Sequence, residues 1–250
     1  MRKLSELTDV EEPAWPLLSK VLAASGVSME VPPVDLDLGR ASLLQLQVTA
    51  RSWLGGMVLN CGGVVLDSGW LRIYGSPVED SSTGLPGGTT DLPSLAEVNG
   101  FPEYFDPDWR PQDGGLVVGH DVLGGVFVLN GPDPESVGRP GHPGEVVYFA
   151  PDSLKWESLE VGHGAWLQWL LHEGTDHFYD TLRWPGWRAE SGALTGIQGL
   201  SVVPFLWSAE ARRDLMSTSR RAVPLAELLS LHRDFALKLD GVDPGFLGDV

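Results

Sequence analysis

The sequence predicts an α+β fold, in which helices pack on a mainly antiparallel β-sheet and a C-terminal helical extension follows. Two observations predict it. Short apolar runs alternate with turn residues through the middle of the chain, which is typical of antiparallel strands. Toward both ends, apolar residues recur at helical spacing. We expect one domain over residues 1–250, divided into an N-terminal helix and connector (1–40), a β-meander region (41–150) and a helical region (151–250).

The N-terminal region predicts a helix over residues 11–26. Trp15, Leu18 and Leu22 repeat at helical spacing, and Gly26 suits the end of the helix. Residues 27–40 contain two adjacent prolines and predict an extended connector.

The meander region begins where the apolar period changes to two. Leucine and valine alternate with polar residues over 44–48, which predicts a half-buried strand. A loop is expected at 76–91, a short helix at 92–99 and a long hairpin loop at 131–144. Further short apolar runs predict strands at 54–59, 63–66, 70–74, 116–120, 126–129 and 145–149.

The last hundred residues favour helices. Trp166, Trp169 and Leu170 share one helical face, and a second helix is expected from Phe178 to Leu182, ended by the segment 184–187. Two more helices are expected at 208–216 and 224–239. Pro224 suits the first position of the last helix.

Composition excludes several classes of protein. The chain has 250 residues, 42% of them apolar, which is too many for a disordered chain. No apolar run approaches the ~20 residues that a membrane span needs. Its 17 basic and 34 acidic residues give a net charge of −17, which argues against nucleic-acid binding. A single cysteine, Cys61, and an N-terminus without an apolar signal segment lead us to expect a cytoplasmic protein.

The negative charge is concentrated in the centre of the sequence. Between Ala41 and Leu182 there are five basic and 19 acidic residues, a net charge of −14. Such a surface either keeps the protein soluble or steers a basic protein partner toward it.

Residues that could carry catalysis do not form a known motif. The pair His172 and His177 is five residues apart, whereas a zinc-protease helix needs a separation of four, so we predict no metal site. His120 and Asp121 are adjacent on a predicted strand and so face opposite ways. We therefore expect no cofactor and assign no catalytic residue.

A set of aromatic and charged residues next to turns is the candidate binding site. The chain has ten tryptophans, six of them between Trp156 and Trp207, which form either a core or an aromatic groove. Trp70 and Arg72 are two residues apart on a predicted strand, so we expect them on one face. The candidate binding residues are Trp70, Arg72, Tyr148, Asp152, Trp156, Arg183, Trp184 and Trp187.

Several strings together resemble one bacterial family, the domain-of-unknown-function family 2625. They are residues 2–7, 14–16, 62–75, 124–131, 147–157 and 178–187. That resemblance implies no assigned activity and no catalytic residues. The order of the elements is also similar to the SMI1/KNR4-type (SUKH-like) immunity-protein superfamily. This second resemblance implies an α+β binding domain, because many of its members neutralise toxins that are often basic nucleases.

These observations favour a non-enzymatic protein-binding module, immunity-like or regulatory, with an acidic surface. We expect its partner to be a basic protein rather than a nucleic acid or a membrane, and the sequence leaves the oligomeric state open. The alternative is a hydrolase-type enzyme that uses His120 and Asp121 or His172 and Glu173.

Overall fold

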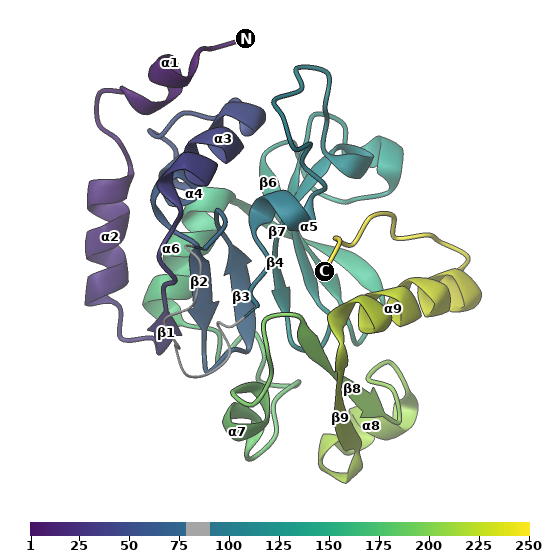
Figure 1. The fold of residues 1–250 in the computed structure, drawn as a ribbon. Coiled ribbons are helices and arrows are strands. Elements are labelled where there is room, and N and C mark those ends of the chain that lie inside the picture. Colours follow the sequence, from purple (N-terminus) through teal and green to yellow (C-terminus); the bar gives the residue numbers. More distant parts are fainter. Residues whose placement is uncertain (79–90) are drawn as a thin grey trace.

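A seven-stranded antiparallel sheet forms the centre of the protein in the computed structural model, which describes residues 1–78 and 91–250 (Figure 1). The strand order across the sheet is the order along the chain, and every neighbouring pair is antiparallel. The α+β class and the meander are thus confirmed. The strands are β1 (Met29–Glu30), β2 (Gly63–Leu66), β3 (Leu71–Tyr74), β4 (Gly115–Asp121), β5 (Val126–Asn130), β6 (Glu145–Ala150) and β7 (Lys155–Gly162).

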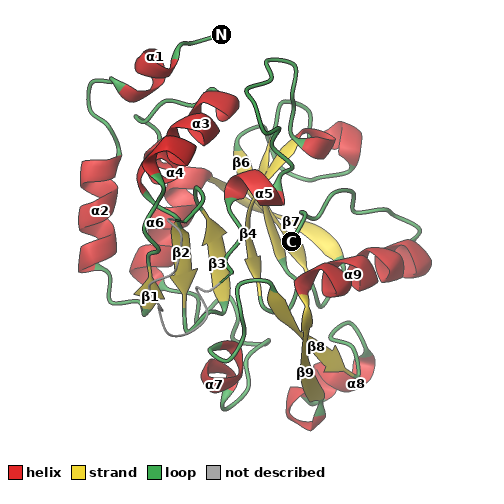
Figure 2. Ribbon diagram, in the orientation of Figure 1, coloured by secondary structure: helices red, strands yellow, loops and turns green. Residues whose placement is uncertain are grey.

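Helices and a small second sheet surround this sheet, as Figure 2 shows. The second sheet pairs β8 (Gln198–Val203) with β9 (Ser219–Pro224). The helices are α1 (Leu4–Thr8), α2 (Trp15–Ala24), α3 (Leu36–Leu46), α4 (Trp53–Asn60), α5 (Leu95–Val98), α6 (His163–Glu173), α7 (Trp187–Ser191), α8 (Ala209–Arg213) and α9 (Leu225–Asp240). Short 3-10 turns lie at Gln112–Gly114, Glu135–Val137 and Leu215–Ser217.

Both faces of the central sheet are covered. One face carries the ring of Phe127, on which Trp166 of α6 packs with its ring centroid 5.2 Å away. The other face carries His120 and meets the C-terminal segment, since the imidazole binds the carbonyl of Leu247. The sheet is therefore the middle layer of the fold (Figure 1), and strands β2 to β6 are almost entirely buried, whereas the edge strand β7 is partly exposed.

Two strands predicted in the meander region are wrong. Residues 44–48 fall mostly in α3, which begins after Asp35, whose carboxylate accepts from the backbone amides of Asp37 and Leu38. Residues 54–59 fall in α4, capped by the Ser52 hydroxyl. A short, wholly apolar run does not distinguish a buried strand from a buried helix. The two glycines of α4 allow the helix to pack closely, and a Cβ on Gly55 would lie 2.1 Å from the Thr49 carbonyl oxygen.

The region predicted to be helical contains three strands as well. Strand β7 lies at the edge of the central sheet, and β8 and β9 form the second sheet. The helix expected from Phe178 to Leu182 is a series of turns instead. Side-chain bonds from Thr175 and Arg183 to Asp67 hold this segment in its non-helical path.

Other expectations are confirmed with shifted ends. The last predicted helix is α9, with Pro224 just before it, and the short helix expected at 92–99 is α5, with a capping box between Ser94 and Glu97. The helix expected at 11–26 begins only at Trp15. Most of the loop expected at 76–91 lies outside the described residues. Among the described residues, no helix combines the length and apolar character needed to cross a bilayer.

Three histidines are buried inside this fold, and burial lowers the pKa of His120, His163 and His232 to about 4. His163 is the clearest case, because neither of its ring nitrogens has a hydrogen-bond partner among the described residues. The unfolded chain protonates a histidine near its ordinary pKa of 6.5. As the pH falls below 6.5, the histidines of the unfolded chain take up protons before those of the folded protein, and this stabilises the unfolded state. The stability that the neutral, buried histidines provide is therefore fully present above pH 6.5 and is lost as the pH falls toward 4.

We predict that His163→Phe makes the protein less sensitive to acid. At pH 7.5 the free energy of unfolding should be unchanged or higher, because two unpartnered polar atoms are removed. At pH 5 the free energy of unfolding of the variant should exceed that of the parent protein by a further ~2 kcal/mol. This is the difference expected because the parent's His163 takes up a proton at pH 5 when the chain is unfolded but not when it is folded. Urea unfolding at both pH values measures this. An equal difference at pH 7.5 and pH 5 would contradict the buried, neutral state of His163.

Candidate functional site

Four of the predicted site residues lie together in one cluster. The ring of Trp70 has its centroid 5.1 Å from that of Trp187 and 5.7 Å from that of Trp184. The guanidinium carbon of Arg183 lies 3.9 Å from the centroid of Trp187. The grouping expected from the sequence is therefore present, although 113 residues separate Trp70 from Arg183 in the chain.

This tryptophan cluster is part of the core. The exposed fractions of Trp70, Trp184 and Trp187 are 0%, 2% and 7%. Arg183 crosses the cluster to form ion pairs with Asp67 and Asp176, at 3.0 and 2.7 Å. A hollow of about 380 Å³, lined by residues 183–188, lies beside it. The structure thus favours core packing over an open aromatic groove.

The other four predicted residues lie elsewhere. Arg72 is fully buried and donates to the carbonyls of Gly196 and Gln198, which attaches the start of β8 to the central sheet. The expectation that Trp70 and Arg72 share a strand face assumed that both lie on β3, but Trp70 lies in the turn before this strand, and its ring stacks with Arg183.

Trp156 and Asp152 lie near the C-terminal part of the chain. The indole of Trp156 donates to the carbonyl of Pro244, and the backbone carbonyl of Asp152 accepts from Arg212. Neither residue reaches the tryptophan cluster through a contact among the described residues. The eight candidate residues therefore do not form a single site.

Tyr148 belongs to a buried hydrogen-bond network centred on Asp121. One carboxylate oxygen of Asp121 accepts from the hydroxyls of Tyr148 and Tyr179, at 2.7 and 3.1 Å. The other accepts from the backbone amides of Leu123 and Gly125, at 2.8 and 2.9 Å. Burial raises the pKa of Asp121, while these four bonds act in the opposite direction by favouring the carboxylate.

His120 lies on the opposite face of the sheet from Asp121 and is also fully bonded. Its Nδ1 lies 2.7 Å from the hydroxyl of Tyr74, and its Nε2 lies 2.7 Å from the carbonyl oxygen of Leu247. Since the carbonyl can only accept, Nε2 carries the proton and Nδ1 accepts from Tyr74. Both groups are completely buried, so this adjacent pair cannot meet a substrate as an acid and a base.

The other residues considered for catalysis show no joint arrangement. His172 is exposed at the end of α6, and Glu173 accepts a hydrogen bond from the Trp169 indole. Burial raises the pKa of the Cys61 thiol to about 11, which disfavours the reactive thiolate. Within the described part of the chain, no three His, Cys, Asp or Glu side chains are placed to hold a metal ion.

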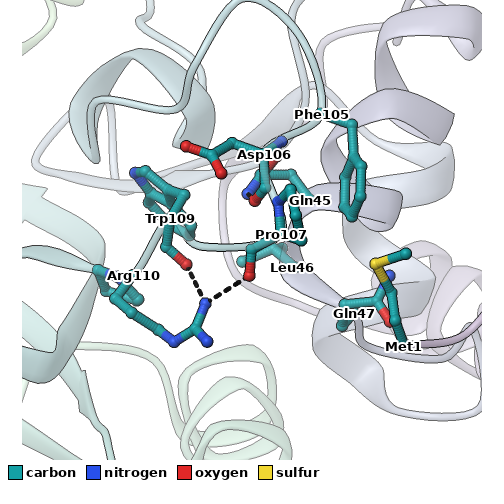
Figure 3. Close-up of a pocket in the computed structure, with 10 residues that line it drawn as sticks. Met1, Gln45, Leu46, Gln47, Phe105, Asp106, Pro107, Trp109 and Arg110 are labelled. Carbon is teal, nitrogen blue, oxygen red and sulfur yellow. Dashed lines mark hydrogen bonds between the residues drawn. The ribbon is translucent and has the colours of Figure 1, made fainter.

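A different surface is open. A pocket of about 490 Å³ lies between the end of α3 and the loop of residues 101–111 (Figure 3). This 101–111 loop presents large aromatic side chains to solvent, with Tyr104 76% and Phe105 37% exposed. Its carboxylates include the exposed Glu103 and Asp108.

The 101–111 loop is held in place by specific bonds. The side-chain amide of Gln45 donates to the carbonyl of Asp106 at 2.9 Å and accepts from the amide of the same residue at 3.0 Å. The indole of Trp109 donates to the carbonyl of Gly100, and its ring lies 4.5 Å from that of Phe101. Arg110 donates back to two carbonyls of its own loop, as Figure 3 shows.

Sequence reasoning missed this surface. Its only signal is the density of aromatic residues in a segment otherwise rich in proline and aspartate, from Phe101 to Pro111. Aromatic side chains are expected to be buried. The loop that carries them is held by a long-range contact between Gln45 and Asp106, which no local pattern reveals.

We predict that the Asp121 network supplies stability. Asp121→Asn removes the charge and places an NH2 group against two of the four donors, so it should lower the free energy of unfolding by about 3 kcal/mol or more. Tyr148→Phe removes one of the four bonds and should cost about 1–2 kcal/mol. Tyr104→Phe, on the exposed loop, is the matched control and should change stability by less than about 0.5 kcal/mol. If urea unfolding shows Asp121→Asn to be no more costly than Tyr148→Phe, the network does not have this role.

Comparison with known proteins places the chain in a family. The model of the family described as "Protein of unknown function DUF2625" matches residues 4–228. The chain is similar to an uncharacterized protein of Escherichia coli (strain K12), YbfG, with 37% identity over 230 residues, which cover 91% of this chain and 94% of that protein. It is also similar to an uncharacterized protein of Haemophilus influenzae, with 31% identity over 82% of this chain and 83% of that protein. No solved structure matches it significantly. The chain therefore belongs to the DUF2625 family.

Proposed function

We propose that this protein is a protein-binding module that captures a basic partner through the 101–111 loop. The observation that carries the proposal is the exposure of Tyr104 and Phe105 on a loop whose backbone is fixed by Gln45 and Trp109. Large aromatic side chains dominate the energetics of protein interfaces, and Tyr and Trp are frequent among the residues that matter most.

The rigidity of the 101–111 loop supports this proposal. Association loses free energy when a loop must be ordered at the interface. Here the loop is already tied to the end of α3 on one side and to Gly100 on the other, so little ordering is left to be done. The adjacent pocket, lined by Met1, Leu46, Phe105 and Pro107 among others, offers an apolar recess for a partner side chain (Figure 3).

Charge supports a basic partner. The exposed carboxylates of Glu103 and Asp108 flank the two aromatic side chains, and the central part of the sequence carries a net charge of −14. Carboxylates at the rim of an interface chiefly accelerate encounter with a positively charged protein and exclude acidic ones. Regulatory and immunity-like roles would both use such a surface, and the identity of the partner distinguishes between them.

We expect binding to depend on the exposed aromatic pair. Tagged full-length protein is used to capture partners at low salt from the cells that produce it, and each purified partner is then titrated. The double variant Tyr104→Ser/Phe105→Ser should raise the Kd at least tenfold, which is the loss of affinity expected when a hot-spot residue of an interface is removed. The control Met216→Ser/Leu237→Ser alters exposed apolar side chains on other elements and should leave the Kd unchanged.

Charge is tested separately. Glu103→Gln/Asp108→Asn should slow association, and raising the salt concentration should reduce the difference from the parent protein. A partner that binds the aromatic double variant as tightly as the parent, or the absence of any basic protein enriched over that variant, would contradict the proposal.

A further inference from the structure

We infer that the groove beneath the C-terminal segment (residues 243–250) is a second peptide-binding surface, which the end of the chain itself occupies. Its ligand would be an extended peptide that carries an aliphatic side chain followed by glycine, as Leu247 and Gly248 do here. This surface is separate from the 101–111 loop, and the inference does not depend on the proposed function.

Four hydrogen bonds join the groove to the backbone of the C-terminal segment. Asp113 accepts from the amide of Phe246 at 2.6 Å, and His120 donates to the carbonyl of Leu247 at 2.7 Å. The Val98 carbonyl accepts from the amide of Asp249 at 2.9 Å, and the Trp156 indole donates to the carbonyl of Pro244 at 3.0 Å. Backbone bonds of this kind are available to any extended segment, so they provide affinity without depending on its side chains.

Two positions of the segment provide specificity. The side chain of Leu247 is buried, with 5% exposed, and fills the apolar part of the groove. Gly248 has a φ of +105°, and a Cβ there would lie 2.9 Å from the Cε1 of His120 and 3.0 Å from a methyl carbon of Val98. A residue other than glycine at this position would therefore be strained and would collide with the floor of the groove.

Three features distinguish the C-terminal segment from the rest of the fold. It contains no helix or strand and follows Gly241, which ends α9 in a left-handed conformation. A cavity of about 420 Å³ remains between the segment and α9, so the groove is not completely filled. The segment also lies beyond residue 228, where the match to the family model ends.

The attachment at the start of the segment is weak. Arg233 and Asp243 form a two-bond ion pair at 2.6 and 2.8 Å, but both side chains are about half exposed. Exposed pairs of this kind contribute about 0–1 kcal/mol. Besides the hydrogen bonds and the buried Leu247 side chain, covalent attachment helps the segment to compete for the groove, because it gives a local concentration on the order of mM.

The test uses the full-length protein and a synthetic peptide of residues 243–250. In the variant Leu247→Ser/Gly248→Ala the tethered segment should leave the groove, and the added peptide should bind saturably. The same peptide carrying Gly248→Ala should bind at least tenfold more weakly. The parent protein, with its own segment in place, should also bind the peptide at least tenfold more weakly than the variant does. Adding Tyr104→Ser/Phe105→Ser to the variant should leave peptide binding unchanged, because these residues belong to the 101–111 loop and not to the groove. A negative result for the groove therefore does not count against the proposed function of the loop.

Hydrogen exchange of the parent protein provides a second measurement if the variant does not fold. The amides of Phe246 and Asp249 should exchange through a local opening that leaves the amides of β4 protected. A folded variant that does not bind the peptide would overturn the inference. Exchange of the two amides only on global unfolding would also overturn it, since the segment would then be an inseparable part of the core.

Discussion

The buried carboxylate of Asp121 is the constraint on which much of this structure depends. A charge in the interior is costly unless every lone pair is satisfied, and Asp121 finds four donors on three different parts of the chain. Two are amides of the turn between β4 and β5, one is Tyr148 on β6, and one is Tyr179 in the turns after α6. Gly125 is required in that turn, because a Cβ there would lie 2.1 Å from the carboxylate.

The rest of the interior is built outward from these donors. The ring of Tyr179 lies 5.5 Å from that of Trp70, so the carboxylate network continues into the tryptophan cluster and its arginine. On the opposite face of the sheet, His120 connects Tyr74 to the C-terminal segment. His120 and Asp121, which looked chemically active in the sequence, thus hold elements of the fold together.

The sequence predicted the parts of the fold that local pattern determines. Strands such as Gly63–Leu66 and Val126–Asn130 are short apolar runs bounded by glycine turns, and α9 has a clear start and period. The errors fall where packing between distant segments decides. Residues 54–59 are apolar on every side and became a buried helix, and 178–182 follow a path set by Asp67 from more than a hundred residues away. The same limit applies to the site. Richness in tryptophan predicted a cluster of Trp70, Trp184 and Trp187, but neither its burial nor the exposure of Tyr104 could be derived from local pattern.

Alkaline titration of the tyrosines tests most directly whether the polar interior is sealed. The chain has four tyrosines; Tyr74, Tyr148 and Tyr179 are buried, and burial raises the pKa of all three. Tyr104 is 76% exposed. Absorbance of the phenolate should show that the three buried tyrosines ionise only as the protein unfolds. Reversible ionisation of two or more tyrosines in the folded protein would contradict a sealed network, and would return Tyr148 and Asp121 to the set of groups that a ligand can reach.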